Sequence, residues 1–210
     1  MTIVAALKQN GEIWMAADRQ TTFNYDFARA DDVNGSKIVP YRNALIATSG
    51  MALFKNALKY YAASEKEAYN ARFDNDTDVM DFFFKFHGFM KEKYGLGNAK
   101  NDEVEKLSYN SFLVVTTESI YQVSCARDVA SYENFTAIGN GAEIALGAIH
   151  ALTPLIDNPS VILEKALAAG CHFKHGCGGE VDIVHVPSLL KKRGKTKNRT
   201  KPAVKLVSRK

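Results

Sequence analysis

The order in which strand-like and helix-like patterns follow one another constrains the fold of this chain more than any other feature. Short apolar runs typical of strands come first, and a helical period then replaces them. Strand patterns are predicted over 3–7, 13–16, 37–40, 44–49, 111–117, 119–126, 135–138 and 180–186, and helices over 52–71, 76–94, 141–152 and 159–169. The strands are joined by hairpins rather than crossover helices, so the sheets should be largely antiparallel. Two helix pairs with apolar stripes also need sheet faces to cover. We therefore predict an α+β fold, a four-layer αββα sandwich of two sheets between helical layers.

Turn and cap residues support this order. Asn10-Gly11 lies between the first two strands and is typical of a type I′ hairpin. The polar segment 21–36 is predicted to be an excursion across the surface. Asp76-Thr77 can cap the second helix, and Gly95 can end it. The aromatic stripe of that helix indicates a core or a subunit-packing face rather than a cofactor site; its members are Phe82, Phe83, Phe86 and Phe89.

The charge of the chain is divided unevenly. Residues 191–210 hold 10 of the 27 lysines and arginines and none of the 23 aspartates and glutamates, which leaves 1–190 with a net charge of −6. Phosphate recognition needs clustered positive charge, so an acidic body argues against nucleic-acid binding by the folded part. We predict a single domain over 1–190 and a disordered basic tail over 191–210, which could contact an acidic partner or nucleic acid.

Several classes of protein are disfavoured. No apolar run reaches the roughly 20 residues of a membrane-spanning helix, and the first residues lack a signal-peptide pattern. Three cysteines are too few for a disulfide framework, which predicts a reducing, cytoplasmic setting. Four potential metal ligands stand close together: Cys171, His172, His175 and Cys177. Zinc sites usually pair two ligands with two others far away in sequence, so we favour structural cysteines and predict no metal.

Three blocks of sequence point to a family. They are 2–7 with Asn10-Gly11 and Ala16-Ala17-Asp18-Arg19-Gln20-Thr21-Thr22, then Ala137-Ile138-Gly139-Asn140-Gly141-Ala142, then Gly176-Cys177-Gly178-Gly179-Glu180-Val181-Asp182. In this order the blocks resemble the β-type proteasome subunits and most of all their bacterial relative, the HslV peptidase. The resemblance implies the N-terminal-nucleophile (Ntn) hydrolase fold and a closed ring of identical subunits. It also implies peptide or unfolded-protein substrates and no cofactor. Such peptidases usually work with a separate ATPase unfoldase, which no feature of this sequence identifies.

The resemblance also implies the site residues. Thr2 would be the nucleophile once Met1 is removed, with its own α-amine, of pKa near ~8, as the base. Asp18 would orient Lys37, whose charge would favour ionisation of the threonine hydroxyl. An oxyanion hole would lie at Thr48-Ser49-Gly50, with Ser49 and Gly50 as supporting residues. The first substrate pocket would lie near Gln20, Ile46 and Leu53.

Some supporting positions depart from the family pattern. Asn140, followed by Gly141, stands where the family has a serine, and its amide oxygen could accept a hydrogen bond from the α-amine. Cys177 replaces a second serine as a weaker hydrogen-bonding partner. Lys174 stands where a carboxylate is expected; either it lies near the α-amine, or the alignment is shifted by one and it is exposed.

We therefore expect a self-compartmentalising threonine peptidase. Two alternatives stay open because the fold alone does not choose among them. One is a catalytically silent ring subunit, which would assemble without hydrolysis. The other is a hydrolase of small amides, which would show no dependence on peptide length.

Overall fold

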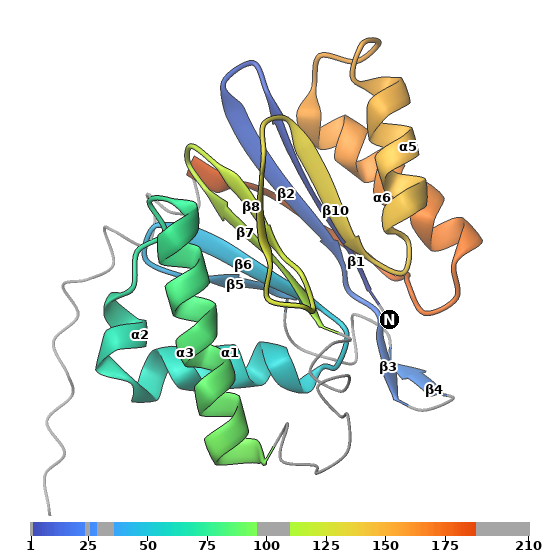
Figure 1. The fold of residues 1–210 in the computed structure, drawn as a ribbon. Coiled ribbons are helices and arrows are strands. Elements are labelled where there is room, and N and C mark those ends of the chain that lie inside the picture. Colours follow the sequence, from blue (N-terminus) through green and yellow to red (C-terminus); the bar gives the residue numbers. More distant parts are fainter. Residues whose placement is uncertain (1, 24–25, 29–35, 96–109, 188–210) are drawn as a thin grey trace, which may run out of the picture.

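The computed structural model describes residues 2–23, 26–28, 36–95 and 110–187. Two antiparallel sheets and a small hairpin organise the chain (Figure 1). One sheet has the order β10-β1-β2-β11, formed by Phe135–Gly139, Ile3–Gln9, Glu12–Asp18 and Val181–His185. The other has the order β5-β6-β7-β8-β9, formed by Ile38–Pro40, Ala44–Ser49, Ser111–Thr116, Ile120–Val123 and Val129–Tyr132. The hairpin pairs β3 (Thr21–Phe23) with β4 (Asp26–Ala28).

Helices cover the outer face of each large sheet (Figure 1). Helices α1 (Leu53–Ser64), α2 (Lys66–Asn70) and α3 (Asp76–Tyr94) lie on the five-stranded sheet. Helices α5 (Ala142–Leu152) and α6 (Pro159–Phe173) lie on the four-stranded sheet. The predicted four-layer αββα sandwich of antiparallel sheets is confirmed. No helix in the described ranges is long and apolar enough to cross a membrane.

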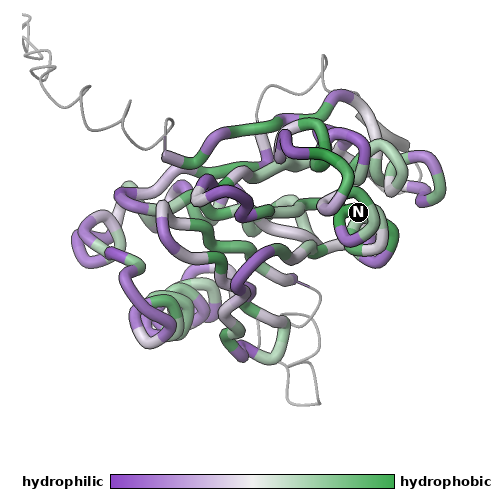
Figure 2. Tube along the Cα trace, turned by 90° about the horizontal axis from the view of Figure 1, so that it is seen from above, coloured by the Kyte–Doolittle hydropathy of each residue, from purple (hydrophilic) through white to green (hydrophobic). Residues whose placement is uncertain are grey.

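Three apolar clusters fill the spaces between the four layers. The central cluster joins the two sheets and includes Val4, Leu45, Leu113 and Val115. A second cluster joins β1 and β10 to α5 and α6. Figure 2 shows hydrophobic segments running along the strands between the helical layers. Burial of this apolar surface is the main force that holds the layers together.

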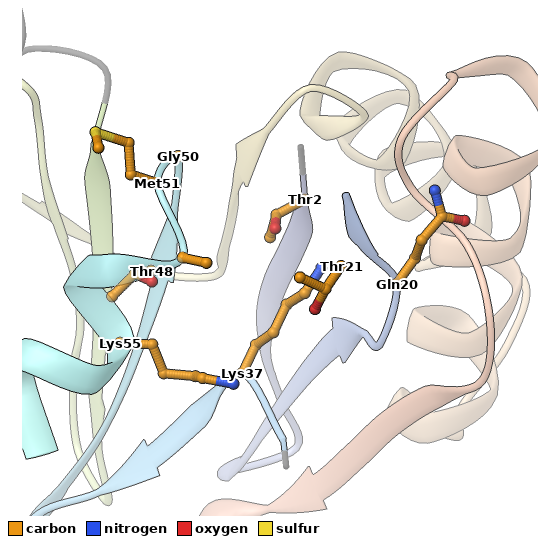
Figure 3. Close-up of a pocket in the computed structure, with 9 residues that line it drawn as sticks. Thr2, Gln20, Thr21, Lys37, Thr48, Gly50, Met51 and Lys55 are labelled. Carbon is orange, nitrogen blue, oxygen red and sulfur yellow. The ribbon is translucent and has the colours of Figure 1, made fainter. Parts of the chain in front are cut away.

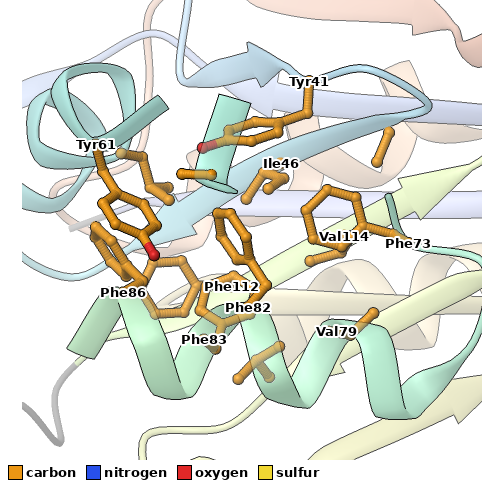
Figure 4. Packing of buried hydrophobic residues seen from close by; sticks show 14 of the residues in the cluster. Tyr41, Ile46, Tyr61, Phe73, Val79, Phe82, Phe83, Phe86, Phe112 and Val114 are labelled. Atoms are coloured by element: carbon orange, nitrogen blue, oxygen red, sulfur yellow. The ribbon is translucent and has the colours of Figure 1, made fainter. Parts of the chain in front are cut away.

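The third cluster is aromatic and lies between the five-stranded sheet and the outer helices (Figure 4). Phe82 makes edge contacts with Tyr41 and Phe73, and Phe83 contacts Phe112 of β7 at a centroid distance of 4.5 Å. Edge-to-face pairs of this kind add to the gain from burial alone. The stripe predicted on the second helix is therefore a core face, as expected.

The structure corrects several predicted boundaries. The helix predicted over 52–71 is divided at Glu65, whose extended backbone (φ −100°, ψ 120°) separates α1 from α2. No glycine or proline marks this break in the sequence. After the break, Ala68 of α2 is buried in the aromatic cluster. The cap of α3 is Asn75, whose side chain accepts a hydrogen bond from the Asp78 N–H at 2.9 Å, rather than Asp76-Thr77.

Two further differences concern strands. Strand β9 was not predicted from the sequence, because its residues are half-exposed at the sheet edge and lack a regular apolar alternation. The polar segment predicted as a plain surface excursion begins with the β3–β4 hairpin. The predicted tail, 191–210, and the domain boundary at residue 190 lie outside the described residues. Val186 is still part of the central core, so the folded unit extends at least that far.

Candidate active site

Pairing of β1 with β2 decides where the candidate site forms. The Asn10-Gly11 turn has positive φ at both residues, as a type I′ turn requires, and it sets a register that places Val4 opposite Ala17. Asp18 therefore ends β2 beside the start of β1. The last strand pairs with the other edge of β2 and places Val181 opposite Asp18. Three segments that are distant in sequence thus meet around one carboxylate.

Asp18 is fully buried and accepts three hydrogen bonds. Its Oδ1 accepts from the Ile3 N–H at 2.9 Å and from the Lys37 Nζ at 2.7 Å, and its Oδ2 accepts from the Gly178 N–H at 3.1 Å. A buried carboxylate is tolerated when it is paired and hydrogen-bonded in this way. Asp18 therefore fixes the start of β1, the glycine turn before β11 and the lysine side chain relative to one another.

Lys37 lies immediately before β5 and is also buried, at 8% exposure. Its pairing with Asp18 was predicted from the family resemblance alone, because 18 residues lie between the two positions. The structure brings both side chains together in a buried ion pair. The Lys37 side chain also lines a cavity that Thr2, the residue before β1, lines as well (Figure 3).

Thr2 is held in place by its backbone. Its carbonyl accepts a hydrogen bond from the Asn140 N–H at 2.8 Å, and the residue is buried to 5% exposure. Gly139 has a φ of +98°, and a Cβ at this position would overlap the Thr2 carbonyl. The Gly-Asn-Gly turn that the sequence analysis singled out therefore packs directly on the candidate nucleophile. Its third member, Gly141, packs on Ile3, where a Cβ would lie 2.8 Å from the Ile3 Cδ1.

The segment after β6 forms another wall of the cavity. Thr48 and Gly50 line it, whereas the Ser49 side chain between them is buried at the end of the strand. Gly50 has a φ of +112°, which favours glycine. The next N–H, that of Met51, donates to the Asn110 Oδ1 at 2.7 Å, and Asn110 is 1% exposed. Sequence reasoning did not identify Asn110, since a lone asparagine before a strand carries no recognisable signal.

Lys55 is a second residue that sequence reasoning missed. It comes from the first turn of α1 and lines the same cavity as Thr2 and Lys37 (Figure 3). Burial lowers the pKa of Lys55, and the charges of Lys59 and Lys37 lower it further. The helical spacing that placed position 55 on the polar side of α1 could not show that this side faces a cavity.

The predicted first pocket is only partly correct. Gln20 lines the cavity, together with Thr21 and Met51. Ile46 and Leu53 do not, because Ile46 is fully buried in the aromatic cluster and Leu53 packs against it. Strand alternation places Ile46 and Thr48 on the same face of β6, toward the helices, but only Thr48, nearer the end of the strand, reaches the cavity.

The other supporting residues, Asn140 and Cys177, lie in the two glycine-rich turns. The Asn140 side chain donates to the His175 carbonyl at 3.1 Å, which joins the two glycine-rich turns. Cys177 is buried, and this burial, followed by the nearby Asp18 charge, raises the pKa of its thiol. Lys174 is half-buried at the C-cap of α6, where its N–H donates to the Gly170 carbonyl at 3.1 Å.

The cysteine and histidine cluster shows no metal-like arrangement. Among the residues that the structure describes, no three His, Cys, Asp or Glu side chains converge as ligands. Burial also raises the pKa of the Cys171 thiol to about 12, with Asp18 as the next cause.

Comparison with known families and structures agrees with this architecture. A model of the family described as "Proteasome subunit" matches residues 1–172. The chain belongs to the proteasome subunit family. The resemblance stated from the three sequence blocks is confirmed, and family membership supports a proteasome-type peptidase. No curated protein matches the chain.

Solved structures show the same fold. The BPH protein of Thiobacillus denitrificans in complex with epoxomicin is 26% identical, with a TM-score of 0.78 over 88% of this chain and 99% of that one. A second BPH structure from the same organism is 27% identical, with a TM-score of 0.76 over 88% and 98% of the two chains. The eukaryotic HslV of Trypanosoma brucei, 14% identical with a TM-score of 0.61 over 87% and 98%, shares the fold.

Proposed function

We propose that the chain is a self-compartmentalising threonine peptidase in which Thr2, exposed by removal of Met1, attacks peptide bonds. The observation that carries this proposal is the meeting of Thr2 and Lys37 at one cavity, with Lys37 held by the buried Asp18 carboxylate at 2.7 Å. Membership in the proteasome subunit family supports the same reaction. A nucleophile, an available base and a fixed positive charge are the parts that acyl transfer requires.

In the proposed reaction, the Thr2 Oγ attacks the peptide carbonyl and its proton passes to the freed α-amine of the same residue. The Lys37 ammonium stabilises the negative charge that develops on Oγ, and the N–H of Gly50 stabilises the oxyanion. The intermediate then collapses: the C–N bond breaks, and the departing amine takes the proton from the α-amine. Water hydrolyses the resulting ester, which releases the acid and restores the Thr2 hydroxyl.

Intact-mass measurement and one substitution test this mechanism. The mature protein should lack Met1, and Thr2→Ala should abolish hydrolysis of fluorogenic peptides while the fold, followed by circular dichroism, is retained. Thr2→Ser should keep part of the activity because the hydroxyl remains. Since a related BPH structure was solved with epoxomicin, addition of this compound should also increase the mass of the wild-type chain and not that of Thr2→Ala. Active protein that retains Met1 would rule out this mechanism.

The proposal extends to assembly. Identical subunits would form a closed ring with their Thr2 sites facing an inner chamber, and a separate ATPase would deliver unfolded substrates. Native mass spectrometry would measure the subunit number. A ring that neither hydrolyses peptides nor reacts with epoxomicin would instead identify a silent structural subunit. Hydrolysis of small amides without any dependence on peptide length would identify a small-amide hydrolase.

A further inference from the structure

Lys55 differs from Lys37 in the way its charge is compensated. The Lys37 ammonium is paired with Asp18 at 2.7 Å. Within the described ranges, no carboxylate pairs with Lys55, and the charged groups that act on it are the cations Lys59 and Lys37. Lys55 is half-buried, so water screens its charge less than that of a surface lysine. A lysine of this kind is stabilised when an anion occupies the cavity beside it.

The rest of the cavity wall is compatible with an anionic side chain carried on a short apolar arm. Thr21 and Thr48 provide hydroxyl groups, while Met51 and Ala52 provide apolar surface. Lys55 reaches the cavity from α1, on a different side from Thr2, which lies just before β1 (Figure 3). A residue whose carbonyl lies at the Thr2 Oγ could therefore extend its own side chain toward the Lys55 ammonium.

We infer that Lys55 selects peptide substrates with an acidic side chain, glutamate or aspartate, at the residue whose carbonyl Thr2 attacks. This inference rests on the proposed function. In the complex, the substrate carboxylate pairs with the Lys55 Nζ and relieves its repulsion with Lys37 and Lys59. Charge-assisted hydrogen bonds are stronger than neutral ones, so the carboxylate is preferred to an amide of the same shape.

A matched pair of substrates measures this preference. Two fluorogenic peptides that differ only in glutamate or glutamine before the scissile bond have nearly the same size and differ in charge. We expect kcat/KM to be about tenfold higher for the glutamate peptide at low salt. The preference should decrease with added salt, because ions screen the pair. A wild-type enzyme that cleaves the glutamine peptide as well as the glutamate peptide would overturn the inference.

Substitutions assign the preference to Lys55. Lys55→Met should remove the preference while hydrolysis of the glutamine peptide continues, and Lys55→Glu should shift the preference to arginine at the same position. The matched control is Lys59→Met, which removes a charge from the exposed face of the same helix and should leave most of the preference in place. If Lys55→Met and Lys59→Met lost the glutamate preference equally, the preference would come from the overall positive charge of the helix, which would contradict the assignment to Lys55.

A binding measurement separates this inference from the proposed mechanism. In the Thr2→Ala background, fluorescence anisotropy should show tighter binding of a labelled peptide ending in glutamate amide than of one ending in glutamine amide. Lys55→Met in the same background should make the two affinities equal. If wild-type protein hydrolyses no peptide but this difference in affinity is present, the threonine mechanism fails and the carboxylate site stands. If hydrolysis occurs without any difference in affinity or in kcat/KM, the carboxylate site fails.

Discussion

At the scale of single residues, Asp18 connects stability to the proposed chemistry. Its two oxygens accept hydrogen bonds from Ile3, Lys37 and Gly178, which belong to three separate segments. Removing one partner of a buried pair is costly because the other charge stays buried without compensation. The same carboxylate therefore determines both the position of Lys37 and part of the cohesion of the fold.

We predict that Asp18→Asn lowers the free energy of unfolding by about 3 kcal/mol, because Lys37 loses its buried counter-ion. Chemical denaturation monitored by circular dichroism would measure the change. The matched control is Asp74→Asn, which removes an exposed carboxylate paired with Arg72 and should leave the unfolding midpoint unchanged. Equal effects of the two substitutions would contradict the importance of the buried pair.

His87 makes the aromatic core sensitive to acid. The residue is 5% exposed beside Phe83, Phe86 and Phe112, and burial, followed by the charge of Arg127, lowers its pKa to about 4. The unfolded chain, with a histidine pKa of about 6.5, binds more protons between these values. The contribution of His87 to the free energy of unfolding is therefore fully present above pH 6.5, and it is lost as the pH falls toward about 4.

His87→Phe should remove this part of the acid sensitivity, which amounts to about 3 kcal/mol at most. Denaturant titrations at pH 7 and pH 4.5 would measure it. Replacement of the exposed His150 by glutamine serves as the control and should keep the wild-type dependence on pH. A His87→Phe protein with an unchanged pH dependence would show that other groups are responsible.

At the scale of elements, the close approach of β1 to the turn after β10 sets the position of Thr2. Ile3 of β1 pairs with Gly139 of β10, and the Asn140 N–H continues this pairing by binding the Thr2 carbonyl. A residue without a side chain is needed at 139, both for the backbone contact and for its φ of +98°. The glycine is thus part of the geometry that places the candidate nucleophile.

Gly139→Ala should destabilise the protein by about 2 kcal/mol or more, because the new Cβ overlaps the Thr2 carbonyl and the backbone conformation is strained. Gly147→Ala in α5 is the contrasting control, since nothing lies within 4 Å of its added Cβ. It should stabilise the helix by about 0.5–1 kcal/mol. Thermal unfolding would rank the two variants; a neutral Gly139→Ala would contradict the contact.

Sequence patterns predicted some of the boundaries of helices and strands and missed others. Strong signals, such as the Asn10-Gly11 turn and the left-handed Gly95 after α3, were predicted correctly. The break at Glu65 and the edge strand β9 were not, because neither has a turn residue or an apolar period of its own. Both are determined by packing against neighbouring elements, which overrides local propensity.

At the scale of the whole molecule, the cores that join the four layers are built from residues between Ile3 and Val186. The basic segment 191–210 follows after these cores end. We predict that its deletion leaves the unfolding temperature, the subunit number and peptide hydrolysis unchanged, while lowering affinity for an acidic polymer such as heparin. Differential scanning calorimetry, native mass spectrometry and heparin chromatography would measure these properties. Loss of assembly would show that the domain extends beyond residue 190.

The sequence by itself determined the order of strands and helices, the antiparallel hairpins and the identity of Thr2, Asp18 and Lys37 as candidates. These inferences depend on local turn chemistry, on hydrophobic period and on short blocks shared with a family. Only the tertiary structure decided that Asp18 and Lys37 form a buried pair, that Ile46 faces the core and that Lys55 borders the cavity. The physical reason is that a cavity is formed by residues distant in sequence, whose proximity depends on how the layers pack.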